Sequence, residues 1–182
     1  MQLSSVILSL AASIALSSSG LTAQTQQPAP KTACQTDEAF RAFDFWVGNW
    51  DVTANQGGQF AGNNSIKVIE GGCALLETWT GNSGSTGIST NHYNPLTKKW
   101  RQLWISAGAY SIDYEGGIKD GSMVMEGNIW YYSNGNSFPF RGSWTPRQNG
   151  TVRQLFEQFN PDKNEWAVWF DGIYTPSAPK PE

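Results

Sequence analysis

From Trp50 onward the chain alternates short stretches of β-branched and aromatic residues with turn sequences at nearly regular intervals. The turn sequences read NQGG, EGG, GNSGS, NPLTKK, GGIKDG, NGNS, PRQNG and NPDKN. Gly, Asn, Asp, Pro and Ser at such positions favour tight chain reversals. We therefore predict strands over residues 49–54, 60–70, 73–80, 86–93, 99–106, 110–116, 122–132, 138–145, 151–159 and 165–174.

Ten short strands joined by short turns predict an all-β fold, in which an up-and-down meander closes into a barrel. An open sheet of this size would leave aromatic edges exposed. Two segments, Tyr93–Trp100 and Phe159–Trp166, share the order aromatic residue, Asn-Pro, four residues, Trp. This similarity predicts two equivalent turns between strands and no repeated domain.

The segment Thr36–Gly48 is the one stretch with helical character, and it runs into the motif FDFWVGNWDV. Its large aromatic residues lie at helical spacing on one face: Phe40, Phe43 and Trp46. We predict one short N-terminal helix that plugs an end of the barrel with these rings. A catalytic role for the motif would need Asp44 or Asp51 as acid or base, and neither has a partner nearby in sequence.

The first 23 residues carry no charge and contain the apolar run VILSLAASIAL. We interpret residues 1–23 as a signal peptide cleaved after Ala23, which predicts a secreted or periplasmic protein. A membrane anchor is the alternative, but the run is too short and serine-rich against the roughly 20 apolar residues a span needs. Residues 24–35 are predicted as a disordered lead-in, 36–175 as the barrel domain and 176–182 as a flexible tail.

Cys34 and Cys73 are the only cysteines, and both follow the expected cleavage site. A pair of cysteines in an exported protein predicts a disulfide. A thiol nucleophile or a metal site would need further ligands, and His92 is the only histidine. We therefore predict a Cys34–Cys73 bridge and no metal site.

The charges are balanced, with 12 basic and 15 acidic side chains and a net charge of −3. No basic cluster is present, so we expect no nucleic-acid partner. No later apolar run approaches a membrane span, and we expect a monomer without a cofactor.

The motif FDFWVGNWDV, together with GGCALLETWTG, YNPLTKKWRQLW and DGSMVMEG, resembles a family of secreted bacterial proteins with a domain of unknown function. The resemblance covers roughly Cys34 to Tyr174 and implies a lipocalin-like (calycin-like) barrel. In its Trp near the first strand, the opening motif also resembles lipocalins and nitrobindin-like haem barrels. The glycine-rich run and the C-terminal histidine of the haem barrels are absent here, so haem is not expected.

Alternation along the predicted strands assigns side chains to the lumen. Gln102 and Trp104 should point inward, because they lie on the face of their strand opposite to Arg101, which we expect to face solvent. Glu77 shares its face with Leu75 and Trp79 and is the carboxylate expected in the lumen; His92 is expected at the surface.

Arg141 is a further expected lumen residue, as a partner for Glu77 or for a ligand carboxylate. The alternative is that the other face of this strand points inward, with Phe138, Phe140 and Trp144 inside the barrel. One strand further on, either Arg153 with Glu157 or Gln154 with Gln158 must face in.

A lumen lined by Glu77, Gln102, Trp104 and Arg141 predicts a barrel that binds a small amphipathic molecule. One alternative is a barrel enzyme, an isomerase, lyase or hydrolase, with Glu77 as base and Arg141 stabilising negative charge. Another is an envelope or interaction protein with a filled core, because small barrels are often filled by their own side chains.

Overall fold

The computed structural model describes residues 30–177. The expected signal peptide at 1–23, residues 24–29 of the expected lead-in and residues 178–182 of the expected tail lie outside this range. The described chain from Lys31 onward forms one compact unit, which contains every element of secondary structure described below.

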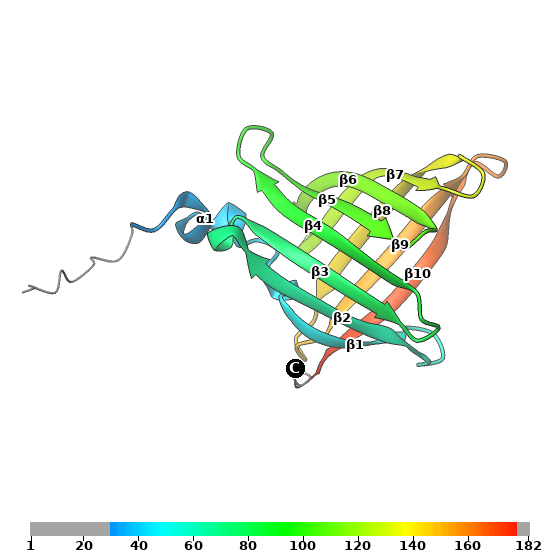
Figure 1. Cartoon of the computed structure of the whole chain (residues 1–182), viewed down its shortest axis with the longest axis horizontal. Coiled ribbons are helices and arrows are strands. Elements are labelled where there is room, and N and C mark those ends of the chain that lie inside the picture. The colour runs from blue at the N-terminus through cyan, green and yellow to red at the C-terminus, as the bar shows by residue number, and fades with distance from the viewer. Residues whose placement is uncertain (1–29, 178–182) are drawn as a thin grey trace, which may run out of the picture. The chain divides into compact units, whose positions relative to one another are not determined.

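Ten antiparallel strands form a closed up-and-down barrel in which each strand pairs with its neighbours in the chain and β10 closes onto β1 (Figure 1). The all-β barrel prediction is therefore confirmed. The strands are β1 (Gly48–Ala54), β2 (Phe60–Ile69), β3 (Ala74–Gly81), β4 (Thr86–Asn94), β5 (Lys99–Ser106), β6 (Tyr110–Lys119), β7 (Ser122–Tyr131), β8 (Ser137–Pro146), β9 (Val152–Asn160) and β10 (Glu165–Pro176).

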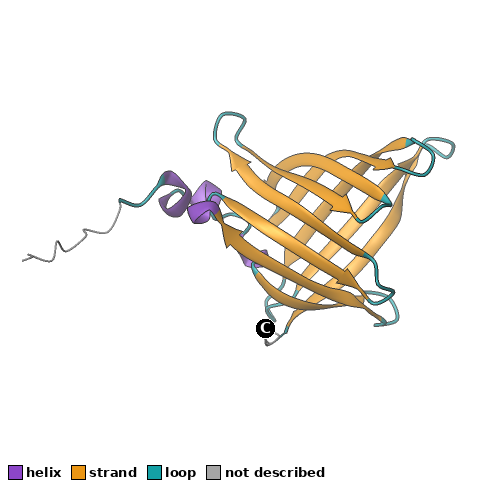
Figure 2. Cartoon of the chain, in the orientation of Figure 1, coloured by secondary structure: helices purple, strands orange, loops and turns teal. Residues whose placement is uncertain are grey.

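The helical segments gather at one end of the barrel (Figure 2), which we call the helical end. They are α1 (Ala33–Thr36), η1 (Glu38–Phe40), η2 (Asp44–Trp46) and η3 (Glu70–Gly72). The opposite end, where β1 joins β2 and β9 joins β10, is called the far end. The expected short N-terminal helical segment is present, but it consists of one short α-helix and separate 3-10 turns and is not a single helix over residues 36–48.

The rings of Phe43 and Trp46 close the helical end and are fully buried. Phe43 stacks on Trp46 at 4.9 Å between ring centroids and meets Trp144 edge-on at 5.2 Å. Two indoles of the barrel wall fix the segment by hydrogen bonds. Trp50 Nε1 donates to the Trp46 carbonyl at 2.9 Å, and Trp100 Nε1 donates to the Ala39 carbonyl at 3.0 Å. The predicted aromatic plug is therefore present.

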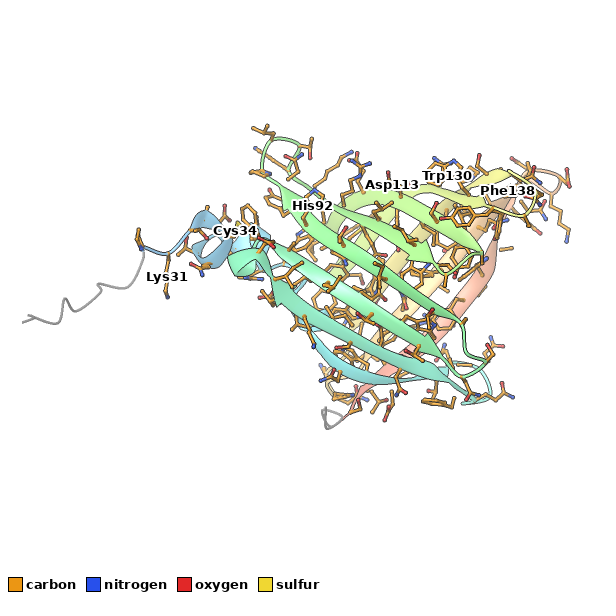
Figure 3. All side chains as sticks on the ribbon, viewed as in Figure 1. Lys31, Cys34, His92, Asp113, Trp130 and Phe138 are labelled. Carbon is orange, nitrogen blue, oxygen red and sulfur yellow. A yellow bond between two sulfur atoms is a disulfide. The ribbon has the colours of Figure 1, made fainter. Side chains whose placement is uncertain are left out.

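A disulfide joins Cys34 in α1 to Cys73, which follows η3, with an S–S distance of 2.02 Å. The predicted pairing is confirmed, and it ties the N-terminal segment to the β2–β3 connection. Residues 33–35 of the expected lead-in are helical. Figure 3 shows Cys34 and His92 toward the helical end and Trp130 and Phe138 toward the far end. Among the described residues, no helix has both the length and the apolar character needed to cross a bilayer.

Candidate functional site

A cavity of about 160 Å³ occupies the half of the lumen nearer the far end. An apolar cavity of roughly 150 Å³ can hold one benzene molecule, so this space suits a small molecule with one or two rings. Most of its wall is aromatic or aliphatic: Trp79, Trp104, Tyr110, Ile112, Phe156, Trp169, Phe170 and Tyr174. Three polar side chains complete the lining: Glu77, Gln102 and Gln154.

The cavity stays hollow because several of its rings lie against glycines of the barrel wall. A Cβ at Gly142 would lie 2.8 Å from the ring of Phe156, and one at Gly87 would overlap the ring of Trp104. The same relation holds at two further places, Gly62 with Trp79 and Gly172 with Phe170. Each missing side chain lets a ring lie close to the wall, which leaves the axis of the barrel free.

A β-bulge in β10 places two successive aromatic residues at the cavity. Val168 pairs with Glu157 and Phe170 pairs with Phe156, so Trp169 is the additional residue. Bulges re-aim side chains in this way. The indole N–H of Trp169 donates to the Tyr131 hydroxyl at 3.0 Å, and this contact holds the ring at the cavity edge.

Among the described residues that line the cavity, Glu77 is the one carboxylate, and it is only 3% exposed. The amide of Asn64 donates to one carboxylate oxygen, and the hydroxyl of Ser89 donates to the other, both at 2.6 Å. Both oxygens therefore act as acceptors, which is the arrangement of an ionised carboxylate.

A chain of hydrogen bonds leads to Glu77 across four neighbouring strands, β6 to β3. Tyr114 donates to Gln102, Gln102 to Asn91, Asn91 to Ser89 at 2.9 Å, and Ser89 to Glu77. Three of these four links join directly opposite residues on adjacent strands. In each of these hydrogen bonds the donor is the residue further from Glu77. All the bonds therefore point toward the carboxylate and polarise one another.

A second branch reaches Glu77 from the other side of the barrel. The Tyr174 hydroxyl donates to Gln154, and Asn64 lies between Tyr174 and Glu77, with its amide nitrogen 3.4 Å from the Tyr174 oxygen. The Oδ1 atom of Asn64 is buried and has no hydrogen-bond partner in the described part of the chain. The region around Glu77 thus retains an unused acceptor.

Burial raises the pKa of Glu77 from 4.5 to about 7, although the hydrogen bonds from Ser89 and Asn64 oppose the shift. Burial also raises the pKa of Tyr110 to about 12. The nearby indole N–H of Trp104 opposes this rise, although its contact with the Tyr110 hydroxyl falls short of hydrogen-bond geometry. At neutral pH, Glu77 is therefore the group in the lining that changes its charge.

Three of the four predicted lumen residues come together in the cavity: Glu77, Gln102 and Trp104. The predicted position of Arg141 is corrected. Arg141 lies on the outer wall, where its Nε atom is 2.7 Å from an oxygen of Glu157 and its guanidinium stacks 4.3 Å from the ring centre of Trp166.

The inner positions of β8 belong to Phe140 and Trp144, which are fully buried. The reason is energetic, because burying two large rings is favourable whereas burying a guanidinium without a partner is costly. On β9 it is likewise Gln154 that faces the cavity, while Arg153 pairs with Asp171 at 2.8 Å.

Four polar residues around Glu77 were not assigned from the sequence as ligand-site residues: Asn64, Ser89, Asn91 and Tyr114. Ser89, Asn91 and Tyr114 each lie opposite a polar residue on a neighbouring strand, whereas Asn64 lies opposite Trp50 and Trp79. Trp169 and Phe170 were also missed, because simple alternation cannot place two consecutive residues in the same lumen.

No group of three or more His, Cys, Asp or Glu side chains within residues 30–177 is arranged to hold a metal ion. Comparison with protein-family models and with curated proteins finds no match to this sequence. Function is therefore inferred from the geometry of the cavity.

Proposed function

We propose that this protein is a secreted or periplasmic barrel that binds a small amphipathic molecule in the far-end half of its lumen. The observation that carries the proposal is the cavity of about 160 Å³, with aromatic walls and the polar cluster around Glu77. Aromatic walls with a few fixed polar groups are typical of small-molecule sites. The ligand would place its apolar part between the rings and its polar group at Glu77.

A filled-core barrel explains the molecule less well than a binding barrel. Aromatic side chains are abundant enough to fill the lumen, and at the helical end they do so. At the far end the rings lie against glycines, and space remains. A barrel without a ligand would gain stability by filling this space.

The extracytoplasmic location is supported by the Cys34–Cys73 disulfide, since such bonds persist in oxidising compartments. The uncharged apolar sequence of residues 1–23 agrees with export. Membership in the family of secreted lipocalin-like proteins that the sequence resembles belongs to the same proposal.

A barrel enzyme, the alternative function, was expected to use Glu77 and Arg141, and only Glu77 lines the cavity. Glu77, with a pKa of about 7, is suited to act as a base at neutral pH. Arg141, which would have stabilised developing negative charge, lies on the outer wall in an ion pair with Glu157. Binding without chemistry therefore fits the cavity better.

Native mass spectrometry of protein purified from its own host would test the proposal, with indole as an added neutral probe in calorimetry. We expect a bound small molecule or measurable indole binding in the wild type. Gly87→Ala should weaken indole binding on the order of tenfold, because the new methyl group pushes Trp104 into the cavity.

Gly117→Ala is the matched control, since a Cβ at this strand position meets no atom within 4 Å. It should bind as the wild type does. Protein that carries no ligand from its host and takes up no indole would contradict the proposal.

A further inference from the structure

The charged side chains of the barrel are distributed unevenly between its two faces. Three arginines of the wall are held in ion pairs outside the lumen: Arg101 with Asp113, Arg141 with Glu157 and Arg153 with Asp171. The cavity lining holds Glu77 and, among the residues the structure describes, no basic side chain. The carboxylate of Glu77 therefore has no cationic partner within residues 30–177.

A buried carboxylate without a counter-charge is costly, and hydrogen bonds offset only part of that cost. Glu77 accepts from Asn64 and Ser89, and the polarised chain from Tyr114 reinforces the second of these bonds. These hydrogen bonds offset part of the cost of a negative charge at a position where the residues that the structure describes supply no positive charge. A positively charged group entering the cavity would complete the site.

The walls of the cavity suit a cation as well. The indole rings of Trp79, Trp104 and Trp169 and the phenol of Tyr110 surround the space next to Glu77. Aromatic faces attract organic cations, and the attraction grows when water is excluded. The buried, unpartnered Oδ1 atom of Asn64 adds one acceptor to the surroundings of Glu77.

We propose that the ligand of this cavity is a small organic cation, a protonated amine with an aromatic or aliphatic body, whose ammonium group pairs with Glu77. This inference rests on the binding function proposed above and names the chemical class of its ligand. The ammonium group donates to acceptors around Glu77, and the body of the molecule lies between the rings of the far-end half.

The electrostatics of the neighbouring groups point in the same direction. The titratable groups facing Glu77 are the phenols of Tyr110, Tyr114 and Tyr174, and burial together with the charge of Glu77 raises the pKa of each. All three are therefore neutral at neutral pH and none compensates the carboxylate. An anionic ligand would meet Glu77 with no cation to offset it, and a neutral alcohol would form hydrogen bonds without neutralising the charge.

Calorimetric titration of the purified protein with two matched sets of probes tests the inference at about pH 8, above the pKa of Glu77. One set is phenethylamine, phenethyl alcohol and phenylacetate, and the other is tryptamine, tryptophol and indoleacetate. Within each set the body is constant and only the charge of the head group changes. We expect each amine to bind on the order of tenfold or more tighter than its alcohol, with the carboxylate weakest.

Two variants connect the preference to the carboxylate. Glu77→Gln should lower the affinity for the amines on the order of tenfold while changing that for the alcohols by less than about threefold. Glu126→Gln removes an exposed carboxylate from the outer wall and should leave all affinities unchanged. Retention of the near-ultraviolet circular dichroism spectrum would show that both variants are folded.

The outcomes separate the two proposals. If the alcohols or carboxylates bind as tightly as the amines, or if Glu77→Gln keeps the amine preference, the lumen binds small molecules but the cation inference is wrong. If none of the six probes binds, the cation inference is wrong, and the ligand content of the host-purified protein and its uptake of indole then decide the binding function.

Discussion

The two halves of the lumen are built from the same kinds of side chain, but one half is packed with rings and the other contains a cavity. At the helical end Phe43, Trp46 and Trp144 contact one another across the axis and are fully buried. At the far end Trp104 and Phe156 lie against the wall and border a cavity of about 160 Å³. Aromatic content alone therefore does not decide whether a small barrel is solid or hollow.

The two halves differ in two ways: an N-terminal segment inserts rings into the helical end, and glycines of the wall lie behind the rings of the far end. The helical end receives Phe43 and Trp46 from a segment that precedes β1, and the disulfide anchors the start of that segment. The far end has only turns, and glycines of the wall accept its rings. The polar layer around Glu77 separates the two halves.

The largest expected effect comes from breaking the solid half. Trp46→Ala should lower the free energy of unfolding by about 3–5 kcal/mol, as for large buried aromatics, because Trp46 is fully buried among other rings. Trp169→Ala, at the edge of the hollow half and 37% exposed, should cost less than about 2 kcal/mol. Chemical denaturation measures both, and equal losses would show that the two halves do not differ as described.

The second prediction concerns the polar layer between the halves. The pKa of Glu77 is about 7 in the folded protein and 4.5 in its ordinary state, so the folded protein binds the proton more tightly. The stabilisation from this difference is fully present below about pH 4.5 and is lost as the pH rises through about 7. The free energy of unfolding should therefore fall by about 3 kcal/mol over this range through Glu77 alone.

Glu77→Gln isolates that contribution, because the variant cannot titrate at this position. The stability difference between the variant and the wild type should shift by about 3 kcal/mol in favour of the variant between pH 4.5 and 8. Glu126→Gln, on the exposed face of β7, should show no such shift. Parallel pH profiles for Glu77→Gln and the wild type would contradict the raised pKa.

The smallest effect is expected outside both halves. Arg141→Met breaks an ion pair whose arginine side chain is 35% exposed, so the loss should be below about 1 kcal/mol. Binding of small molecules in the lumen should not change, because Arg141 does not line the cavity. A tenfold loss of affinity for any of the probes would mean that Arg141 reaches the ligand after all.

Several features of the molecule follow from the sequence alone. The ten strands were predicted to within a few residues, because turn residues and alternating side chains are local signals. The Cys34–Cys73 bridge followed from having two cysteines after the expected cleavage site. Alternation next to Arg101 also placed Gln102 and Trp104 correctly in the lumen.

Alternation fixes which residues share a face but not which face is inside. For β8 the sequence left both parities open, and the burial of Phe140 and Trp144 decided against Arg141. The aromatic residues on one face of this strand were the available signal, since burying two large rings is more favourable than burying a guanidinium. The helical segment was misjudged for a related reason, because the barrel rim, and not local propensity, determined where the chain bends.

The sequence by itself determined the number of strands, their turns, the disulfide and the alternating pattern of each strand, because each depends on residues close together or on a single pair. Only the tertiary structure decided the register across strands, the bulge that brings Trp169 beside Phe170, and the glycines that face particular rings. It also assembled the series of hydrogen-bond donors that leads to Glu77 from three neighbouring strands. These features join residues far apart in the chain, and they exist only once closure of the barrel fixes which strand positions are opposite.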